Sequence, residues 1–233
     1  MTVVVTDVTR ATPDGVLVEA MLERLPDCDV SVLVGLGLHR PMTDIELREG
    51  LGEYVDLAVN HDPDVTVEVA TVDGLNGDDV PVRVHPLVAE ADCLLSTGMV
   101  EPHQYAGFSG GAVAVGAGDG SLIGYTHGSG VLSHPDVRLG RIEDNPFRDI
   151  VDRAGDAVGL DFCLNVTKGP EGVLGASPGR PRAVVADLAE TARAALSVPC
   201  SDIFDAVIGG VGAPSHSPRW NSSRNGLASP TRT

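Results

Sequence analysis

The sequence predicts an α/β protein with a mainly parallel sheet and flanking helices. Short runs of aliphatic, mostly β-branched residues, of which TVVVTD at 2–7 is the first, alternate with segments whose apolar residues recur at helical spacing. Polar or glycine-containing stretches follow several of the apolar runs. This alternation is typical of βαβ units, in which a helix returns the chain to the start of the next parallel strand.

The individual elements follow from the same patterns. Residues 2–7, 14–25 and 29–37 predict a strand, a helix and a second strand. A helix is expected after Thr43, because Glu46 three residues later completes a capping-box signature. Later strands are expected at 55–61, 65–71, 80–85, 92–98, 161–169 and 172–179, and later helices at 145–159 and 180–197.

The 233 residues divide into two expected regions. Residues 1–200 hold the alternating elements and are predicted to form one α/β domain of Rossmann-like type. Residues 201–233 are predicted to hold one further strand, at 204–214, and a polar tail.

Charge is the strongest compositional signal. The chain has 33 acidic and 16 basic residues, a formal net charge of -17, and Lys168 is its only lysine. Because 42% of the residues are hydrophobic, we expect a folded domain with an acidic surface, and not a disordered acidic tail. Such a surface disfavours nucleic acid and anionic membranes as partners and is typical of a protein from a high-salt, halophilic cytoplasm.

The N-terminus and the cysteines bear on cellular location. No leader-like segment opens the sequence and no apolar run is long enough to span a membrane, so we expect a cytoplasmic protein. The four cysteines, which form no CxxC pair, are expected to be buried, inert thiols.

Histidines gather in the loops expected near the carboxyl ends of the strands, where open parallel sheets bind their ligands. His39, His103 and His127 are the main candidates. They fit a metal set, because imidazole binds nickel, zinc, copper and iron. Two of them also fit an acid/base pair on opposite sides of a substrate. For His39, a structural hydrogen-bonding role is a further alternative.

Two other segments are candidates for ligand binding. Asp7 and Arg10 lie in the first βα loop, where a helix N-terminus favours anions; a helix-capping Asp and a surface Arg are the plainer alternative. The glycine loop within EPHQYAGFSGGAVAVGAG, residues 101–118, matches neither the dinucleotide fingerprint nor the P-loop. The glycines alone therefore indicate no particular cofactor.

Several motifs taken in order resemble the nickel-pincer lactate racemase family. DVTRATP at 7–13 resembles that family's D-x-T-R-x-x-P loop, and GLGLHRPMTDIEL at 35–47 resembles its G-x-H-R-x-x-T-x-x-E-L segment. EPHQYAGFSGG at 101–111 resembles its E-P-H-x-x-A-G-F-S-G-G signature, and the stretch at 126–146 resembles a later element that ends in N-P. RWNSSR at 219–224 corresponds to the family's Y-Q-A-S-[RK] motif.

The resemblance implies a racemase or epimerase of small 2-hydroxy acids. It implies hydride transfer to a nickel-pincer nucleotide, a nicotinic-acid-derived mononucleotide that holds nickel. By position, His39 and His103 would be the catalytic acid/base residues and His127 the nickel ligand. The implied substrate-binding residues are Arg10, Asn221 and Arg224, and the implied cofactor-binding residues are Asp7, Thr9, Gly107, Ser109, Gly110 and Gly111.

Two departures from the family pattern leave alternatives open. Val113 stands where the family has the lysine that tethers the cofactor, so we expect non-covalent binding if the cofactor binds. Lys168 lies far along the sequence and is not expected to replace that lysine. The chain is also shorter than the family's members, which have a second α/β domain. It is therefore expected to be an active racemase, a degenerate homologue that binds only nucleotide or nickel, or one half of an enzyme completed by a second chain.

Overall fold

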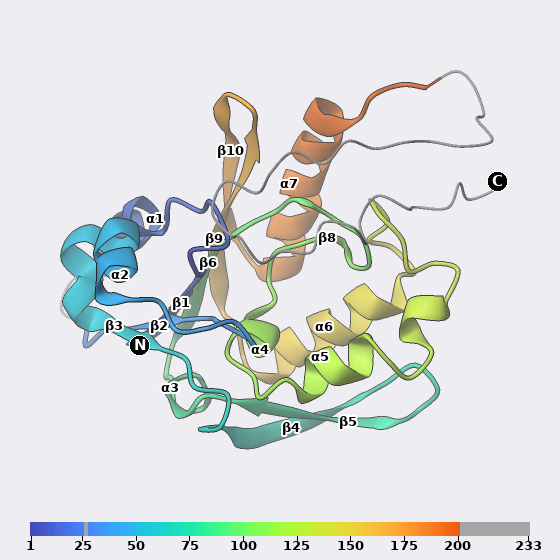
Figure 1. Ribbon diagram of the computed structural model, residues 1–233, viewed down its shortest axis with the longest axis horizontal. Coiled ribbons are helices and arrows are strands. Elements are labelled where there is room, and N and C mark those ends of the chain that lie inside the picture. The colour runs from blue at the N-terminus through green and yellow to red at the C-terminus, as the bar shows by residue number, and fades with distance from the viewer. Residues whose placement is uncertain (26–27, 201–233) are drawn as a thin grey trace. The chain divides into compact units, whose positions relative to one another are not determined.

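The computed structural model describes residues 1–25 and 28–200, and its centre is a six-stranded sheet (Figure 1). The strands lie in the order β10-β9-β6-β1-β2-β3. All neighbouring strands are parallel except β9 and β10, which form an antiparallel hairpin. Their bounds are Thr2–Val5 (β1), Ser31–Val34 (β2), Ala58–Asn60 (β3), Leu94–Met99 (β6), Phe162–Gly169 (β9) and Gly172–Gly179 (β10). The predicted α/β class with a mainly parallel sheet is confirmed.

Burial on both faces explains why the central strands read as unbroken apolar runs. All four residues of β1 are buried, and so are all six of β6. Parallel strands covered by helices on both sides have this pattern, because neither face meets water. The short edge strand β3 is partly exposed, in keeping with its position.

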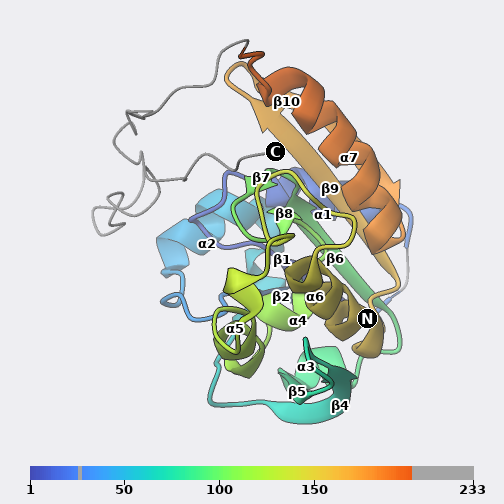
Figure 2. The same cartoon turned by 90° about the vertical axis from the view of Figure 1, so that its right-hand side faces the viewer.

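Helices cover the sheet on its two faces, as Figures 1 and 2 show. Alternate β1 residues face opposite ways: Val3 and Val5 join one hydrophobic cluster with residues of α1 and α2, and Val4 joins another with residues of α4, α5 and α6. Helix α7 packs on β9 and β10. The bounds are Asp14–Leu22 (α1), Asp44–Leu51 (α2), Pro86–Ala89 (α3), Val113–Gly116 (α4), Ser121–Thr126 (α5), Pro146–Ala157 (α6) and Pro181–Leu196 (α7), with 3₁₀ turns at Gly52–Leu57 and Val131–Ser133.

The predicted start of α2 is confirmed in detail. The Thr43 side chain accepts a hydrogen bond from the Glu46 backbone, and the Glu46 carboxylate accepts one from the Thr43 backbone. Two backbone N–H groups that no helical carbonyl reaches are thereby satisfied. The helix begins where the sequence places it.

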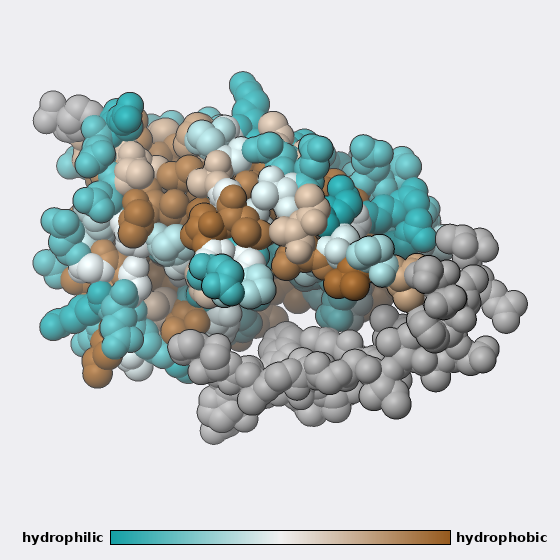
Figure 3. Space-filling view, turned by 90° about the horizontal axis from the view of Figure 1, so that it is seen from above, coloured by the Kyte–Doolittle hydropathy of each residue, from teal (hydrophilic) through white to brown (hydrophobic). Residues whose placement is uncertain are grey.

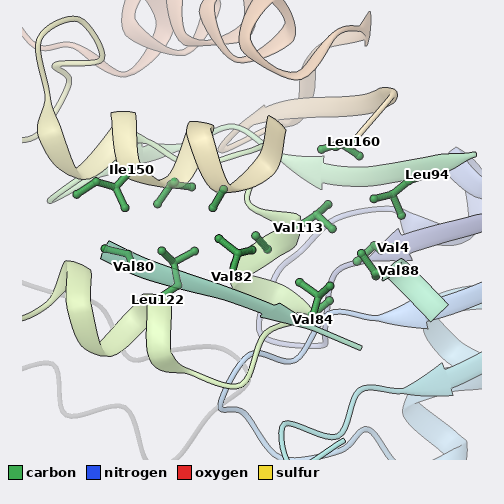
Figure 4. Close-up of a cluster of buried hydrophobic side chains, with 14 of the residues drawn as sticks. Val4, Val80, Val82, Val84, Val88, Leu94, Val113, Leu122, Ile150 and Leu160 are labelled. Carbon is green, nitrogen blue, oxygen red and sulfur yellow. The ribbon is translucent and has the colours of Figure 1, made fainter. Parts of the chain in front are cut away.

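Two expected strands lie outside the main sheet. β4 (Val67–Asp73) and β5 (Asp79–Val84) form a separate antiparallel hairpin. On β5 only alternate residues, Val80, Val82 and Val84, are buried, and they pack beside Leu122 of α5 and Ile150 of α6 (Figure 4). A strand with one apolar face can cover a helical layer, whereas a central parallel strand must be apolar on both faces.

The cysteines are less buried than expected. Cys163 is fully buried, and burial raises the pKa of its thiol to about 12. Cys93 is partly buried, but Cys28 and Cys200 are exposed, so the expectation was wrong for these two. Cys200 lies at the end of an exposed stretch, residues 193–200.

The direction in which the strands are added to the sheet changes between β1 and β6. From β1 the chain proceeds to β2 and β3 on one side, whereas from β6 it proceeds to β9 and β10 on the other. After β1 and after β6 the chain therefore continues to opposite sides of the sheet, and open α/β sheets bind ligands at such a switch point. On one face of the molecule, hydrophobic residues gather near the middle among hydrophilic ones (Figure 3). None of the helices in the described ranges is long and apolar enough to cross a membrane.

Candidate functional site

The loop after β1 is braced by Asp7. The Asp7 side chain is almost fully buried, and its Oδ1 accepts hydrogen bonds from the backbone N of Thr9, at 2.8 Å, and from Thr9 Oγ1, at 2.5 Å. Asp7 does not cap the following helix, whose N-cap is Pro13, so the capping alternative was wrong. Within residues 1–25 and 28–200, no hydrogen bond or ion pair engages the exposed guanidinium of Arg10.

His39, in the loop after β2, is paired with Asp7. Nδ1 of His39 lies 2.5 Å from Oδ2 of Asp7, and the imidazole is 45% exposed. Because a carboxylate only accepts, Nδ1 carries the proton and Nε2 of the neutral ring has a free lone pair. The hydrogen bond to Asp7 raises the pKa of His39, against the opposing effect of burial. Burial works to raise the pKa of Asp7, but the hydrogen bonds from His39 and Thr9 outweigh it, so that pKa is lowered.

This pair makes a pH-dependent contribution to stability. The raised pKa of His39 stabilises the folded state. This contribution is complete at pH values below the unfolded pKa of 6.5, and it is lost as the pH rises past the pKa of the folded state. The lowered pKa of Asp7 contributes above its unfolded value of 3.8 and is lost as the pH falls. Replacing Asp7 with Asn is therefore expected to lower the free energy of unfolding more at about pH 5.5 than at about pH 9. Urea denaturation at both pH values measures this, and equal losses would contradict the pairing.

His103 lies in the two-residue strand β7 (Pro102–His103), which follows β6 and pairs with β8 (Gly107–Phe108), and its Nδ1 accepts hydrogen bonds where that of His39 donates one. Its Nδ1 accepts from the backbone N of Tyr105, at 3.2 Å, and of Ala106, at 3.0 Å. A nitrogen that accepts two hydrogen bonds carries no proton, so the neutral ring has its proton on Nε2. Burial, followed by the charges of Arg10, His127 and Arg148, lowers the pKa of His103 to about 4. At neutral pH this imidazole is an uncharged Nε2–H donor.

His127 is the C-cap residue of α5 and does not follow a strand, contrary to expectation. Its Nδ1 lies 2.9 Å from the carbonyl oxygen of Ile123, so Nδ1 carries the proton and Nε2 is left with a free lone pair. The ring is exposed and lies 5.3 Å from the ring of Phe147, which is 6.0 Å from the ring of His103. The ring of Phe147 therefore packs against the rings of both His103 and His127.

The mutual effects of their charges show that these side chains lie near one another. The charge of Arg10 acts on both His39 and His103, and the charge of His127 acts on His103. The predicted convergence of the loops after β1, β2 and β6 is thus observed. In the described part of the chain, however, no three His, Cys, Asp or Glu side chains are grouped so as to hold a metal ion. The three histidines are therefore not a metal set by themselves.

The glycine loop is tied down mainly by its own contacts. Ser109 Oγ donates to the carbonyl of Met99, at 2.8 Å, and accepts from the backbone N of Glu101, at 3.0 Å. A side chain at Gly107, whose φ is +76°, would collide with the backbone of Arg141. Contacts within the protein thus account for Ser109 and Gly107 without a ligand.

Gly110 and Gly111 differ from the rest of this loop. Their φ angles are +103° and +67°, which favour glycine. No hydrogen bond within the described residues engages their backbone N–H groups. These two amides are available to an anionic group, so this part of the loop fits the phosphate of a nucleotide better than Ser109 does.

Arg148 of α6 is a site residue that sequence reasoning missed. Its guanidinium is 2% exposed, donates to the carbonyl of Gly110 at 2.9 Å and forms a buried ion pair with Asp152. Asp152 also pairs with Arg182, which is half-exposed. The i,i+4 spacing of Arg148 and Asp152 was visible in the sequence, but it is equally typical of a surface ion pair. Only the packing of α6 against the glycine loop shows that this ion pair is buried.

Val113 and Lys168, the two positions considered for a covalent tether to the cofactor, both lie within the described residues. Val113 is the first residue of α4, is 4% exposed and belongs to the core cluster drawn in Figure 4. Lys168, by contrast, ends near the site: its Nζ donates to the carbonyl of Ala11, at 3.0 Å. Distance along the sequence was thus a poor guide, because β9 runs parallel to β6 and ends at the same edge. Asn221 and Arg224, the other expected substrate contacts, lie outside the described residues.

Comparison with known protein families gives a clear result. The family model for the "Lactate racemase N-terminal domain" matches residues 1–140. The chain is 31% identical over 179 residues to a lactate racemase of Lactiplantibacillus plantarum, covering 70% of this chain and 41% of that protein. It is 30% identical over 175 residues to a lactate racemase of Thermoanaerobacterium thermosaccharolyticum, covering 70% and 40%. The chain thus spans about two-fifths of the length of these relatives.

Solved structures show the same similarity. The lactate racemase apoprotein from T. thermosaccharolyticum superposes with a TM-score of 0.73 at 26% identity, covering 81% of this chain and 48% of that one. A protein from Thermotoga maritima shares the fold, with a TM-score of 0.66 at 24% identity over 82% and 52% of the two chains.

Proposed function

Because the chain belongs to the lactate racemase family, we propose that it takes part in interconverting the enantiomers of a small 2-hydroxy acid. One observation supports this most strongly: His39, His103 and His127 lie near one another and present complementary ring nitrogens. His39 offers a lone pair that can take a proton, His103 an N–H group that can hold an oxygen, and His127 a lone pair that can bind a metal.

The substrate carboxylate is proposed to bind Arg10. A guanidinium binds a carboxylate through two parallel hydrogen bonds, and that of Arg10 has no partner among the described residues. Asn221 and Arg224 are proposed to add contacts, as the family resemblance implies. In a chain of net charge -17, a local cation is needed to draw an anionic substrate to this edge of the sheet.

The two catalytic histidines, His39 and His103, are proposed to have different roles in proton transfer. Nε2 of His39 takes the hydroxyl proton as the substrate carbon loses hydride, and Asp7 stabilises the imidazolium that forms. Nε2–H of His103 holds the same oxygen in the planar 2-oxo acid. His39 returns the proton when the carbon regains hydride on its other face. The family resemblance implies two equivalent bases, whereas the observed hydrogen bonds favour this asymmetric version.

The residues also fit the nickel-pincer nucleotide, provided that it binds without a covalent tether. His127 would bind the nickel through Nε2, and the N–H groups of Gly110 and Gly111 would face the phosphate. Asp7 and Thr9 would act indirectly, because their hydrogen bonds hold His39. When bound, this cofactor supplies the hydride acceptor. Val113 offers no nucleophile, and its side chain lies in the core.

The proposal is tested by adding the cofactor and following lactate enantiomers by chiral chromatography. Replacing His39 with Gln is expected to lower kcat about 100-fold, because positioned acid/base groups contribute at least that much. His134→Gln is the matched control, since His134 is bonded to Asp136 and to no proposed site residue. Cofactor binding without turnover would favour a degenerate homologue. Turnover that needs a second chain would favour a split enzyme.

A further inference from the structure

Asn145 is a fully buried residue that connects α6 to the loop carrying His103. As the N-cap of α6, its Oδ1 accepts from the backbone N of Phe147, at 3.0 Å, and of Arg148, at 3.3 Å. Its Nδ2 donates to the carbonyl of Tyr105, at 2.7 Å, and of Arg141, at 2.8 Å. The amide thus uses both of its N–H groups and its oxygen, with no exposed surface.

The bond to Tyr105 continues to the catalytic ring. The carbonyl of Tyr105 and the N–H of Ala106 belong to one planar peptide group. The oxygen of this group accepts from Asn145, at 2.7 Å, and its N–H donates to Nδ1 of His103, at 3.0 Å. Rotation of the peptide would break both hydrogen bonds together. Asn145 therefore fixes the direction of a donor that keeps the proton off Nδ1 of His103.

Helix capping does not account for both halves of this side chain. Capping needs only an oxygen acceptor, which Asp and Ser supply as well as Asn does. The Nδ2 group is used entirely for carbonyls outside α6. This division allows the two roles to be separated by substitution.

We propose that Asn145 is a positioning residue that, through the Tyr105–Ala106 peptide, holds His103 as the Nε2–H tautomer facing the substrate. The role in catalysis rests on the proposed racemase function, whereas the effect on the tautomer does not. Asn145 acts through the loop and makes no contact with the reacting atoms.

The first test uses the protein without cofactor or substrate. Asn145→Asp and Asn145→Ser keep an oxygen for the cap but remove the amide donor to Tyr105. The ring ¹⁵N shifts of His103, identified by their loss in His103→Gln, report which nitrogen carries the proton. We expect Nε2–H in the wild type and a substantial Nδ1–H population in both variants. An Nδ1–H ring in the wild type, or unchanged Nε2–H in a folded variant, would overturn the proposal.

A matched control and a kinetic readout complete the experiment. Asn60→Asp removes a comparable amide donor, from Nδ2 to the carbonyl of Met42, and should leave the His103 shifts unchanged. In the loaded enzyme, the Asn145 variants should lose about 10- to 100-fold in kcat, as is typical of residues that orient a functional imidazole, with KM nearly constant. An equal effect of Asn60→Asp on the His103 shifts would show that the link is not specific. The ¹⁵N result stands even if the protein has no racemase activity.

Discussion

Replacing Val113 with Lys is expected to lower the free energy of unfolding by about 3–5 kcal/mol, the range for a buried charge left without a partner. Val113 is 4% exposed and packs in the cluster that joins α4, α6 and β5. An ammonium there loses its hydration and is either neutralised, with a strongly lowered pKa, or forces α4 open. Thermal and urea denaturation of the two proteins measure the loss.

Val16→Lys is the control for this substitution. Val16 is 63% exposed on α1, so the same chemical change there should alter stability by no more than about 0.5 kcal/mol. The two variants also differ in what a new amine can reach. If Val113→Lys folded with wild-type stability and gained the mass of the cofactor covalently, position 113 would face the site, contrary to its placement in the core.

Replacing Arg148 with Met is also expected to cost about 3–5 kcal/mol, because it leaves the carboxylate of Asp152 buried with a weaker partner. The Arg148 guanidinium is 2% exposed and the Asp152 side chain 9%. The same substitution frees the carbonyl of Gly110, so the glycine loop should also become more open to hydrogen exchange. Denaturation and amide exchange measure the two effects separately.

Arg182→Met distinguishes burial from charge in this network. Arg182 also pairs with Asp152 but is 49% exposed, and exposed ion pairs contribute at most about 1 kcal/mol. The double variant Arg148→Met with Asp152→Met should recover much of the loss, because no unpaired buried charge remains. Equal costs for the two single Arg variants would show that Arg148 is no more important than a surface residue.

Local patterns in the sequence were enough to predict the elements of the central sheet. The apolar runs of β1 and β6 and the capping box at Thr43 are properties of neighbouring residues, which periodicity and capping chemistry report directly. The placement of Asp7, His39 and His103 at one edge also followed, because parallel strands bring their carboxyl ends together.

Long-range packing decided what could not be predicted. The hairpin of β4 and β5 leaves the main sheet, and helices as short as α4 and α5 show too few turns for a 3.6-residue period. The protonation of His103 depends on backbone N–H groups, which no side-chain pattern records. The contacts of Arg148 and Lys168 with the site join residues 38 and 157 positions apart.

Racemisation by hydride transfer is measured most directly with L-lactate deuterated at C2. The cofactor-loaded protein is incubated with it in ordinary water, and the deuterium content of the D-lactate formed is measured by mass spectrometry. Hydride transfer keeps this hydrogen away from water, because histidines such as His39 exchange only the hydroxyl proton. Hydride transfer should give D-lactate that retains its deuterium. D-lactate that carries hydrogen from the solvent at C2, or the absence of any D-lactate, would contradict it.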